Sequence, residues 1–194
     1  MKVMTTIGVA LGLLACLSGA AFASQPSAEA LAAPCNGCHG PGGVSVGGHI
    51  PSLAGQNADF MEKAMREFKQ GERTATIMNR IAKGYKGHEL GRIARYFSRK
   101  DWRPAETAVA PKKLEKGRVL HQQHCAECHE DMGRYQDKDT PRLAGQQPDY
   151  LYVQMRLYRD DAEMLPQPSD MAEQLAPLHE SDLQALAALY ASIR

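Results

Sequence analysis

The 194-residue chain has few aromatic side chains, almost no net charge and, beyond its N-terminus, no long apolar run. Aromatic residues make up 6% of the sequence, which is thin for a core built from protein side chains alone. The formal charge of +1 leaves no basic field that would indicate binding to nucleic acid. No later stretch is long and apolar enough to predict a membrane span. The composition is that of a globular protein with one large domain or two small ones.

The N-terminus has the pattern of an export signal. Lys2 precedes an apolar run over 7–17, and Ala21-Phe22-Ala23 follows. A basic start, an apolar run and an A-x-A site predict a secretory signal peptide over 1–23 and a periplasmic location. The run is too short for a comfortable membrane anchor. Leu13-Leu14-Ala15-Cys16 also resembles a bacterial lipoprotein cleavage box, so a lipidated Cys16 is the alternative.

The other four cysteines form two C-x-x-C-H motifs, over 35–39 and 125–129. Four cysteines in an exported chain ordinarily suggest two disulfides. In a C-x-x-C-H motif, however, the two thiols bond to the two vinyl groups of a heme, and the adjacent His binds the iron. A zinc site made from the two C-x-x-C pairs is the alternative, but it leaves both histidines unexplained. We predict two covalently bound hemes, with Cys35, Cys38, Cys125 and Cys128 as anchors and with His39 and His129 as axial iron ligands.

The two halves of the chain are repeats of one another. At an offset of 90 residues the two motifs coincide, and P-S-L-A-G-Q at 51–56 coincides with P-R-L-A-G-Q at 141–146. A repeat of this length is near the lower limit for a self-sufficient core, and a buried heme supplies the missing apolar surface. We predict a domain over 24–100, a linker with two prolines over 101–112, and a second domain over 113–194.

Each iron needs a further axial ligand, which in exported electron-transfer cytochromes is commonly Met or His. The repeat favours Met78 and Met171, because Leu90 and Leu183 of the final helices lie 12 residues after them. The offset is 93 at this point, which places three additional residues in the loop before Met171. Met164 is the alternative ligand in the second half, although it does not reproduce this spacing.

The remaining polar residues form no second recognisable site. Five histidines have no counterpart between the repeats, so we interpret them as surface or packing residues: His49, His88, His121, His124 and His179. The glycine-rich segment 40–48 lacks the G-x-G-x-x-G spacing of a nucleotide loop, and its glycines let the backbone pass close to a heme edge. We find no nucleophile–base pair or carboxylate pair, so we expect an electron carrier and no catalytic residue.

Apolar residues recur at helical spacing, and we find no strand pattern. The predicted fold class is all-α, with two tandem class I cytochrome c domains related by internal duplication. We expect helices over 26–38, 58–70, 73–83, 88–99, 112–126, 148–160, 170–176 and 180–192.

Two C-x-x-C-H domains, each with a P-x-L-A-G-Q segment, resemble the diheme cytochromes of the cytochrome c4 group over nearly all of 26–194. The segments F-K-Q-G-E at 68–72 and T-I-M-N-R-I-A-K-G-Y at 76–85 are more specific. They resemble the cytochrome subunit of flavocytochrome c sulfide dehydrogenase. The likeness continues at 96–97 and 103–105 and is weak over 160–170.

This resemblance implies a separate FAD-containing subunit that oxidises sulfide, and a diheme subunit that passes the electrons to a soluble acceptor such as a c-type cytochrome. The most family-specific residues, 66–85, imply that the first heme receives electrons from the flavin. The alternative is a free carrier of the cytochrome c4 type that donates electrons to a terminal oxidase. A diheme enzyme such as a peroxidase or a thiosulfate-oxidising cytochrome needs an open or unusually ligated iron, and the paired methionines argue against one.

Overall fold

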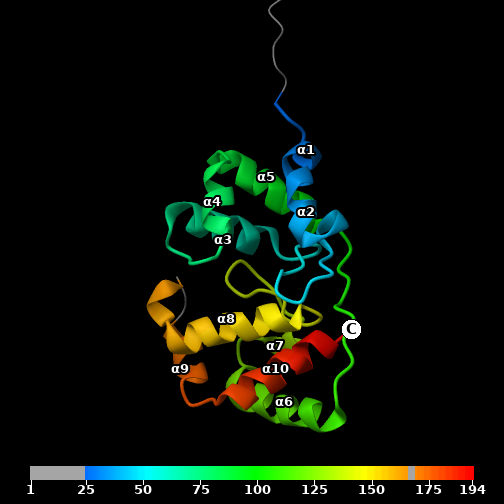
Figure 1. Ribbon diagram of the computed structural model, residues 1–194, viewed down its shortest axis with the longest axis vertical. Helices are drawn as coiled ribbons and strands as arrows, with labels where there is room; N and C mark the ends of the chain where they lie inside the picture. The colour runs from blue at the N-terminus through cyan, green and yellow to red at the C-terminus, as the bar shows by residue number, and fades with distance from the viewer. Residues whose placement is uncertain (1–24, 166–168) are drawn as a thin grey trace, which may run out of the picture.

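The computed structural model describes residues 25–165 and 169–194, so the predicted signal peptide and Cys16 lie outside the described residues. Within the described residues the chain is helical and contains no strand, which confirms the predicted all-α class. None of the described helices has the length and apolar content needed to cross a bilayer. The two halves of the chain are stacked along the long axis of the molecule, and the segment between α5 and α6 runs along one side (Figure 1).

The first half contains α1 (Ala28–Ala32), α2 (Asn36–His39), α3 (Ala58–Gln70), α4 (Met78–Lys83) and α5 (Gly87–Ser98), with 3₁₀ turns over Ala33–Cys35 and Pro41–Gly43. The second half contains α6 (Pro111–His124), α7 (Glu130–Gly133), α8 (Pro148–Asp160), α9 (Ser169–Leu175) and α10 (Glu180–Ser192), with a 3₁₀ turn over Ala162–Met164. The turn over Ala162–Met164 was not predicted from the sequence.

Each half has its own apolar core. In the first half, α1, α3 and α5 bury a cluster that includes Leu31, Met61, Ile93 and Phe97. In the second half, α8 and α10 bury a larger cluster around Leu151, Met155, Leu186 and Tyr190. The predicted duplication is therefore visible as two separately packed sets of helices.

Two predicted helices differ from the observed ones. The helix expected over 73–83 begins only at Met78, because the Asn79 side chain stabilises the preceding segment as a loop. Asn79 Oδ1 accepts the Ala75 N–H at 2.8 Å, and its Nδ2 donates to the Arg73 carbonyl at 2.7 Å. The helix expected over 26–38 is interrupted by a 3₁₀ turn at Pro34, which cannot donate a backbone hydrogen bond.

Backbone hydrogen bonds confirm the register of the two repeats. The Gly55 N–H donates to the Phe97 carbonyl at 2.9 Å, and the Gly145 N–H donates to the Tyr190 carbonyl at 2.7 Å. Both glycines have positive φ, 67° and 75°, a conformation that glycine adopts without steric cost. Phe97 and Tyr190 are therefore equivalent, which agrees with the predicted offset of 93 in the last helix of each half.

A reciprocal pair of glutamines joins the two halves. Gln56 Oε1 accepts the Arg142 N–H at 3.1 Å, and its Nε2 donates to the Arg142 carbonyl at 2.7 Å. Gln146 makes the same two bonds to Ser52, at 2.8 Å to the N–H and 3.0 Å to the carbonyl. Because Ser52 and Arg142 are themselves equivalent in the repeat, the halves meet through a locally two-fold symmetric junction.

Candidate functional site

The first C-x-x-C-H motif lies where α2 meets the core of the first half. Cys35 is partly buried and packs against the cluster of Leu31 and Phe97, whereas Cys38 is exposed. His39 is buried, and its Nδ1 lies 2.8 Å from the Pro51 carbonyl oxygen. Since a carbonyl can only accept, Nδ1 carries the proton and Nε2 keeps its lone pair for a metal.

The second motif repeats this arrangement with one difference. Cys125 is partly buried against the core of the second half, and Cys128 is exposed. His129 is buried, but its Nδ1 has no hydrogen-bond partner in the part of the chain that the structure describes. The second half therefore lacks the carbonyl contact that orients His39, and a buried nitrogen without a partner is costly.

Burial keeps both imidazoles neutral near pH 7. Burial lowers the pKa of His39, and the bond to the Pro51 carbonyl opposes part of that shift. Burial and the nearby His121 lower the pKa of His129 to about 4. A neutral imidazole is the form that binds a metal, so both histidines are ready to act as ligands.

The alternatives to heme attachment find no support among residues 25–165 and 169–194. The four cysteines in these ranges are free thiols, so they form no disulfide. No group of three or more His, Cys, Asp or Glu side chains in the same ranges is arranged to hold a metal ion. The two motifs lie in separate halves of the chain, each beside its own apolar core.

The candidate methionines differ in their surroundings. Met78 is the first residue of α4 and is half-buried. Met171 lies in α9, is half-buried and packs against the core of the second half. Met164 lies in a 3₁₀ turn with 40% of its surface exposed, and its carbonyl accepts the Thr74 N–H at 3.0 Å. Met171 therefore faces apolar surroundings, whereas Met164 lies near the surface.

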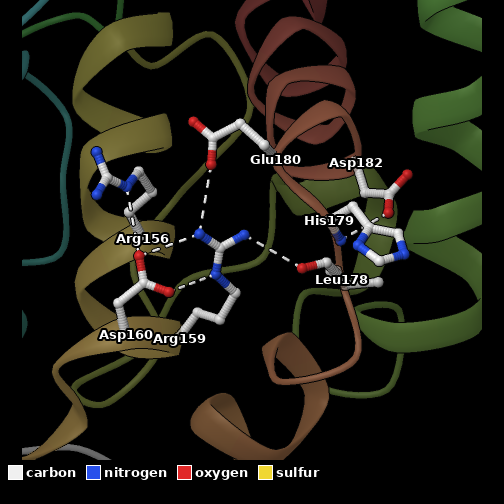
Figure 2. Close-up of polar contacts among 7 residues, drawn as sticks. All are labelled: Arg156, Arg159, Asp160, Leu178, His179, Glu180 and Asp182. Carbon is white, nitrogen blue, oxygen red and sulfur yellow. Dashed lines mark hydrogen bonds and ion pairs between the residues drawn. The ribbon is translucent and has the colours of Figure 1, made fainter.

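Arg159 holds the two ends of the segment that carries Met171 close together (Figure 2). From the end of α8, its Nη1 donates to the Leu178 carbonyl at 3.2 Å, and its Nη2 lies 3.3 Å from Glu180 at the start of α10. Asp160 orients the guanidinium through a contact of 2.6 Å to Nε. Arg159 on α8 thus holds the end of the loop that leads into α10.

The first half contains the equivalent tether. Lys69, 90 residues before Arg159, donates to the carbonyl of Tyr85, which lies 93 residues before Leu178. The following helices also begin alike, because the Lys86 N–H donates to Glu89 and the His179 N–H donates to Asp182. These matching contacts make the segments around Met78 and Met171 structurally equivalent.

The residues of both halves fit a covalently attached heme. Each half brings together two free thiols, a neutral buried His on the same turn and an apolar core that contacts the first Cys. His129 differs from His39 in that its Nδ1 lacks a carbonyl partner among the described residues. In c-type heme attachment, two thiols form the covalent bonds to the heme and an imidazole binds its iron.

One buried polar pair in the second half was missed by the sequence analysis. His121 is 1% exposed, and its Nδ1 lies 2.9 Å from the hydroxyl of Tyr190, which is also 1% exposed. The equivalent residues in the first half are Leu31 and Phe97, so only the second core contains this pair. Comparing the repeats would have revealed it, because both positions change from apolar to polar together. The other four histidines that have no counterpart between the repeats are exposed or half-buried, as expected.

Comparison with known proteins places these observations among c-type cytochromes. No protein-family model matches the chain. It is 45% identical over 74 residues to the cytochrome subunit of sulfide dehydrogenase from Chlorobaculum tepidum, a match that covers 38% of this chain and 66% of that one. It is 29% identical to cytochrome c4 from Azotobacter vinelandii over 83% of each chain. It is 31% identical to cytochrome c-554(548) from Halomonas halodenitrificans, over 33% of this chain and 81% of that one.

A solved structure has the same fold. The reduced cytochrome c4 from Pseudomonas stutzeri superposes with a TM-score of 0.74 at 24% identity, over 88% of this chain and 100% of that chain. The likeness covers both halves, so it includes the arrangement of two tandem helical units as well as each unit alone.

Proposed function

This chain belongs to the diheme c-type cytochromes of the cytochrome c4 type, which carry two covalent hemes, and we propose that it is the electron-transfer subunit of a sulfide dehydrogenase. In this proposal an FAD-containing subunit oxidises sulfide. The chain itself accepts the electrons and passes them to a soluble acceptor such as another c-type cytochrome. The chain is an electron carrier, and the catalytic chemistry belongs to its partner.

We assign the heme-binding residues from the two motifs. Cys35 and Cys38 anchor the first heme and Cys125 and Cys128 the second, with His39 and His129 as the proximal iron ligands. The bond from His39 Nδ1 to the Pro51 carbonyl supports this assignment, because it orients the ring with Nε2 free. Each bound heme supplies reversible one-electron chemistry at its iron.

We assign Met78 and Met171 as the distal ligands. The equivalent tethers from Lys69 and Arg159 support the pairing, because they place both methionines seven residues before the tethered carbonyl. The burial of Met171 against the core supports it over Met164, which is 40% exposed. A thioether ligand raises the potential relative to a second imidazole, which suits an acceptor of electrons.

The domain boundaries and the location follow from the same interpretation. Residues 24–100 and 113–194 form the two heme domains, and 101–112 form the linker between them. Export through the predicted signal peptide over 1–23 places the protein in the periplasm, where heme attachment and exchange with soluble carriers take place.

One observation supports sulfide dehydrogenase over other uses of the fold. The match to the sulfide dehydrogenase subunit is far stronger in identity, 45% against 29%, than the match to cytochrome c4. The cytochrome c4 match, however, extends over 83% of the chain. A free carrier that donates to a terminal oxidase is therefore the second candidate.

The flavoprotein contact is expected near α4. Ile77, at the start of the family-specific segment, is 52% exposed, and the exposed Met164 lies beside the same loop through its bond to Thr74. Exposed apolar side chains of this kind suit a stable complex, in which exposed apolar surface becomes buried.

The decisive experiment is purification of the native protein from the periplasm, followed by addition of sulfide. We expect a flavoprotein to co-elute and both hemes to be reduced on addition of sulfide. Ile77→Asp should abolish co-elution, and the matched change Val119→Asp, at a 48% exposed site on α6, should leave it intact. Elution as a lone diheme protein that sulfide does not reduce would overturn the proposal in favour of the free carrier.

A further inference from the structure

The two halves of the chain carry opposite charge. Residues 24–100 contain eleven Lys and Arg against six Asp and Glu, whereas 113–194 contain nine against fourteen. The halves are stacked along the long axis (Figure 1). The positive and negative excess charges therefore lie toward opposite ends of the molecule. The net charge of the whole chain is near zero, but the charge is separated between its two ends. Such a separation can steer two different partners to the molecule.

Positive charge in the first half gathers in a hollow of about 270 Å³ between α1 and the second half of α5. We call this the cationic hollow, and its lining residues are Ala28, Arg92, Arg95, Tyr96, Arg99 and Lys100. Four of these six residues are cationic and none is anionic. Helical spacing explains the gathering, since residues 92, 95 and 96 share one face of α5 and Arg99 follows directly after its last residue.

The neighbouring groups neutralise little of this charge. Arg95 Nη1 lies 3.8 Å from Glu62 Oε2, the one carboxylate in ion-pair contact with the cationic hollow among the described residues. Arg92 donates to the carbonyl of Pro26 at 2.6 Å, and Lys100 Nζ lies 4.4 Å from the centre of the Tyr96 ring. Both contacts orient a cation without adding negative charge, so the hollow keeps a net positive potential.

Tyr96 connects the cationic hollow with the first heme-binding site. Its ring lines the hollow, meets Phe97 edge-on at 5.1 Å between ring centres, and packs against the core cluster that Cys35 also contacts. A molecule seated in the hollow therefore approaches the first C-x-x-C-H site through one aromatic side chain. This position suits electron exchange as well as binding.

We propose that the cationic hollow is the docking surface for an acidic redox protein whose carboxylates pair with Arg92, Arg95 and Arg99. From Arg92 to Arg99 the arginines span about two turns, or about 10 Å, along α5 and its C-terminal end. This spacing matches several carboxylates on a protein surface better than one small anion. The inference rests on the electron-transfer function proposed above. It assigns a second surface, whose lining residues do not include Ile77 of the expected flavoprotein contact.

The test uses the holoprotein and a fluorescent poly-L-glutamate peptide as the probe of carboxylate binding. Arg95→Glu/Arg99→Glu should weaken binding by about tenfold or more at low salt. The control Lys112→Glu/Lys113→Glu makes the same change in net charge at exposed sites of α6 and should leave the affinity within about twofold. High salt should weaken the wild-type complex strongly.

Three results would overturn the inference: unchanged binding in the α5 variant, equal loss in both variants, or displacement of the peptide by inorganic phosphate at an equal concentration of charge. The last result would indicate a small-anion site. Sulfide-dependent heme reduction through the co-purified flavoprotein is measured on the same two variants. Its retention separates failure of this inference from failure of the proposed function, which would abolish reduction in the wild type as well.

Discussion

Gln146 satisfies both backbone groups of Ser52 across the junction between the halves, accepting from its N–H at 2.8 Å and donating to its carbonyl at 3.0 Å. Gln146 is 2% exposed and Ser52 is 1% exposed, so water cannot replace these bonds. The symmetric contact from Gln56 to Arg142 makes four such bonds in total. These two side chains therefore contribute directly to the relative placement of the two heme-binding sites.

Replacing both glutamines should uncouple the halves. Gln56→Ala/Gln146→Ala leaves buried backbone groups unpaired, at a cost of about 1–3 kcal/mol each. We expect calorimetry of the holoprotein to show two separate unfolding transitions where the wild type shows one. Gln123→Ala, at an exposed site on α6, is the control and should behave as wild type. A single transition at an unchanged temperature in the double variant would show that the linker or other contacts hold the halves together.

The pair of His121 and Tyr190 should make the second half sensitive to pH. Burial lowers the pKa of His121, so folding favours its neutral form. Its contribution to stability is fully present above about pH 6.5 and is lost as the pH falls toward the lowered pKa. We expect denaturant unfolding to give a smaller free energy at about pH 5 than at about pH 7.5. His121→Leu/Tyr190→Phe, which copies the first half, should flatten this dependence.

The single variant Tyr190→Phe supplies the control for packing. It keeps the ring but leaves Nδ1 of His121 buried without its partner, which costs about 1–3 kcal/mol at neutral pH. The double variant should recover part of that loss. If the double variant keeps the wild-type pH dependence, another group is responsible.

Met171 and Met164 can be distinguished by absorption spectroscopy of the oxidised holoprotein. Met171→Ala should halve the methionine–iron band, because one of the two irons loses its sulfur ligand. Met164→Ala should keep the full band, because its side chain is 40% exposed and away from the core. Loss of the band in the Met164 variant alone would reverse the assignment.

Substitution of Gly43 should destabilise the fold more than substitution of a glycine whose added Cβ would meet no other atom. Its φ is +81°, and an added Cβ would lie 2.6 Å from Cδ1 of Phe97 and 3.0 Å from the Ala54 nitrogen. Gly43→Ala should therefore lower the free energy of unfolding by about 2–4 kcal/mol through strain and overpacking. Gly37→Ala meets nothing within 4 Å and should change it by less than about 0.5 kcal/mol. Similar unfolding curves for both variants would contradict this account.

The sequence by itself determined the features that depend on residues close together in the chain or copied by duplication. C-x-x-C-H spans only five residues, so its thiols and His lie close together whether or not the segment is helical. The start of α3 at Asn57 and its end at Gly71 follow from local capping chemistry. The equivalence of Met78 and Met171 follows from the repeat spacing, and the matching tethers of Lys69 and Arg159 agree with it.

Only the tertiary structure decided which distant side chains meet. The partners of Gln56 and Gln146 lie 86 and 94 residues away, and His121 meets Tyr190 across 69 residues. The cationic hollow needs α1 packed beside α5, and the late start of α4 needs Asn79 to bond the loop before it. Such contacts depend on how the helices pack around two separate cores, and the spacing of residues along one helix carries no record of that packing.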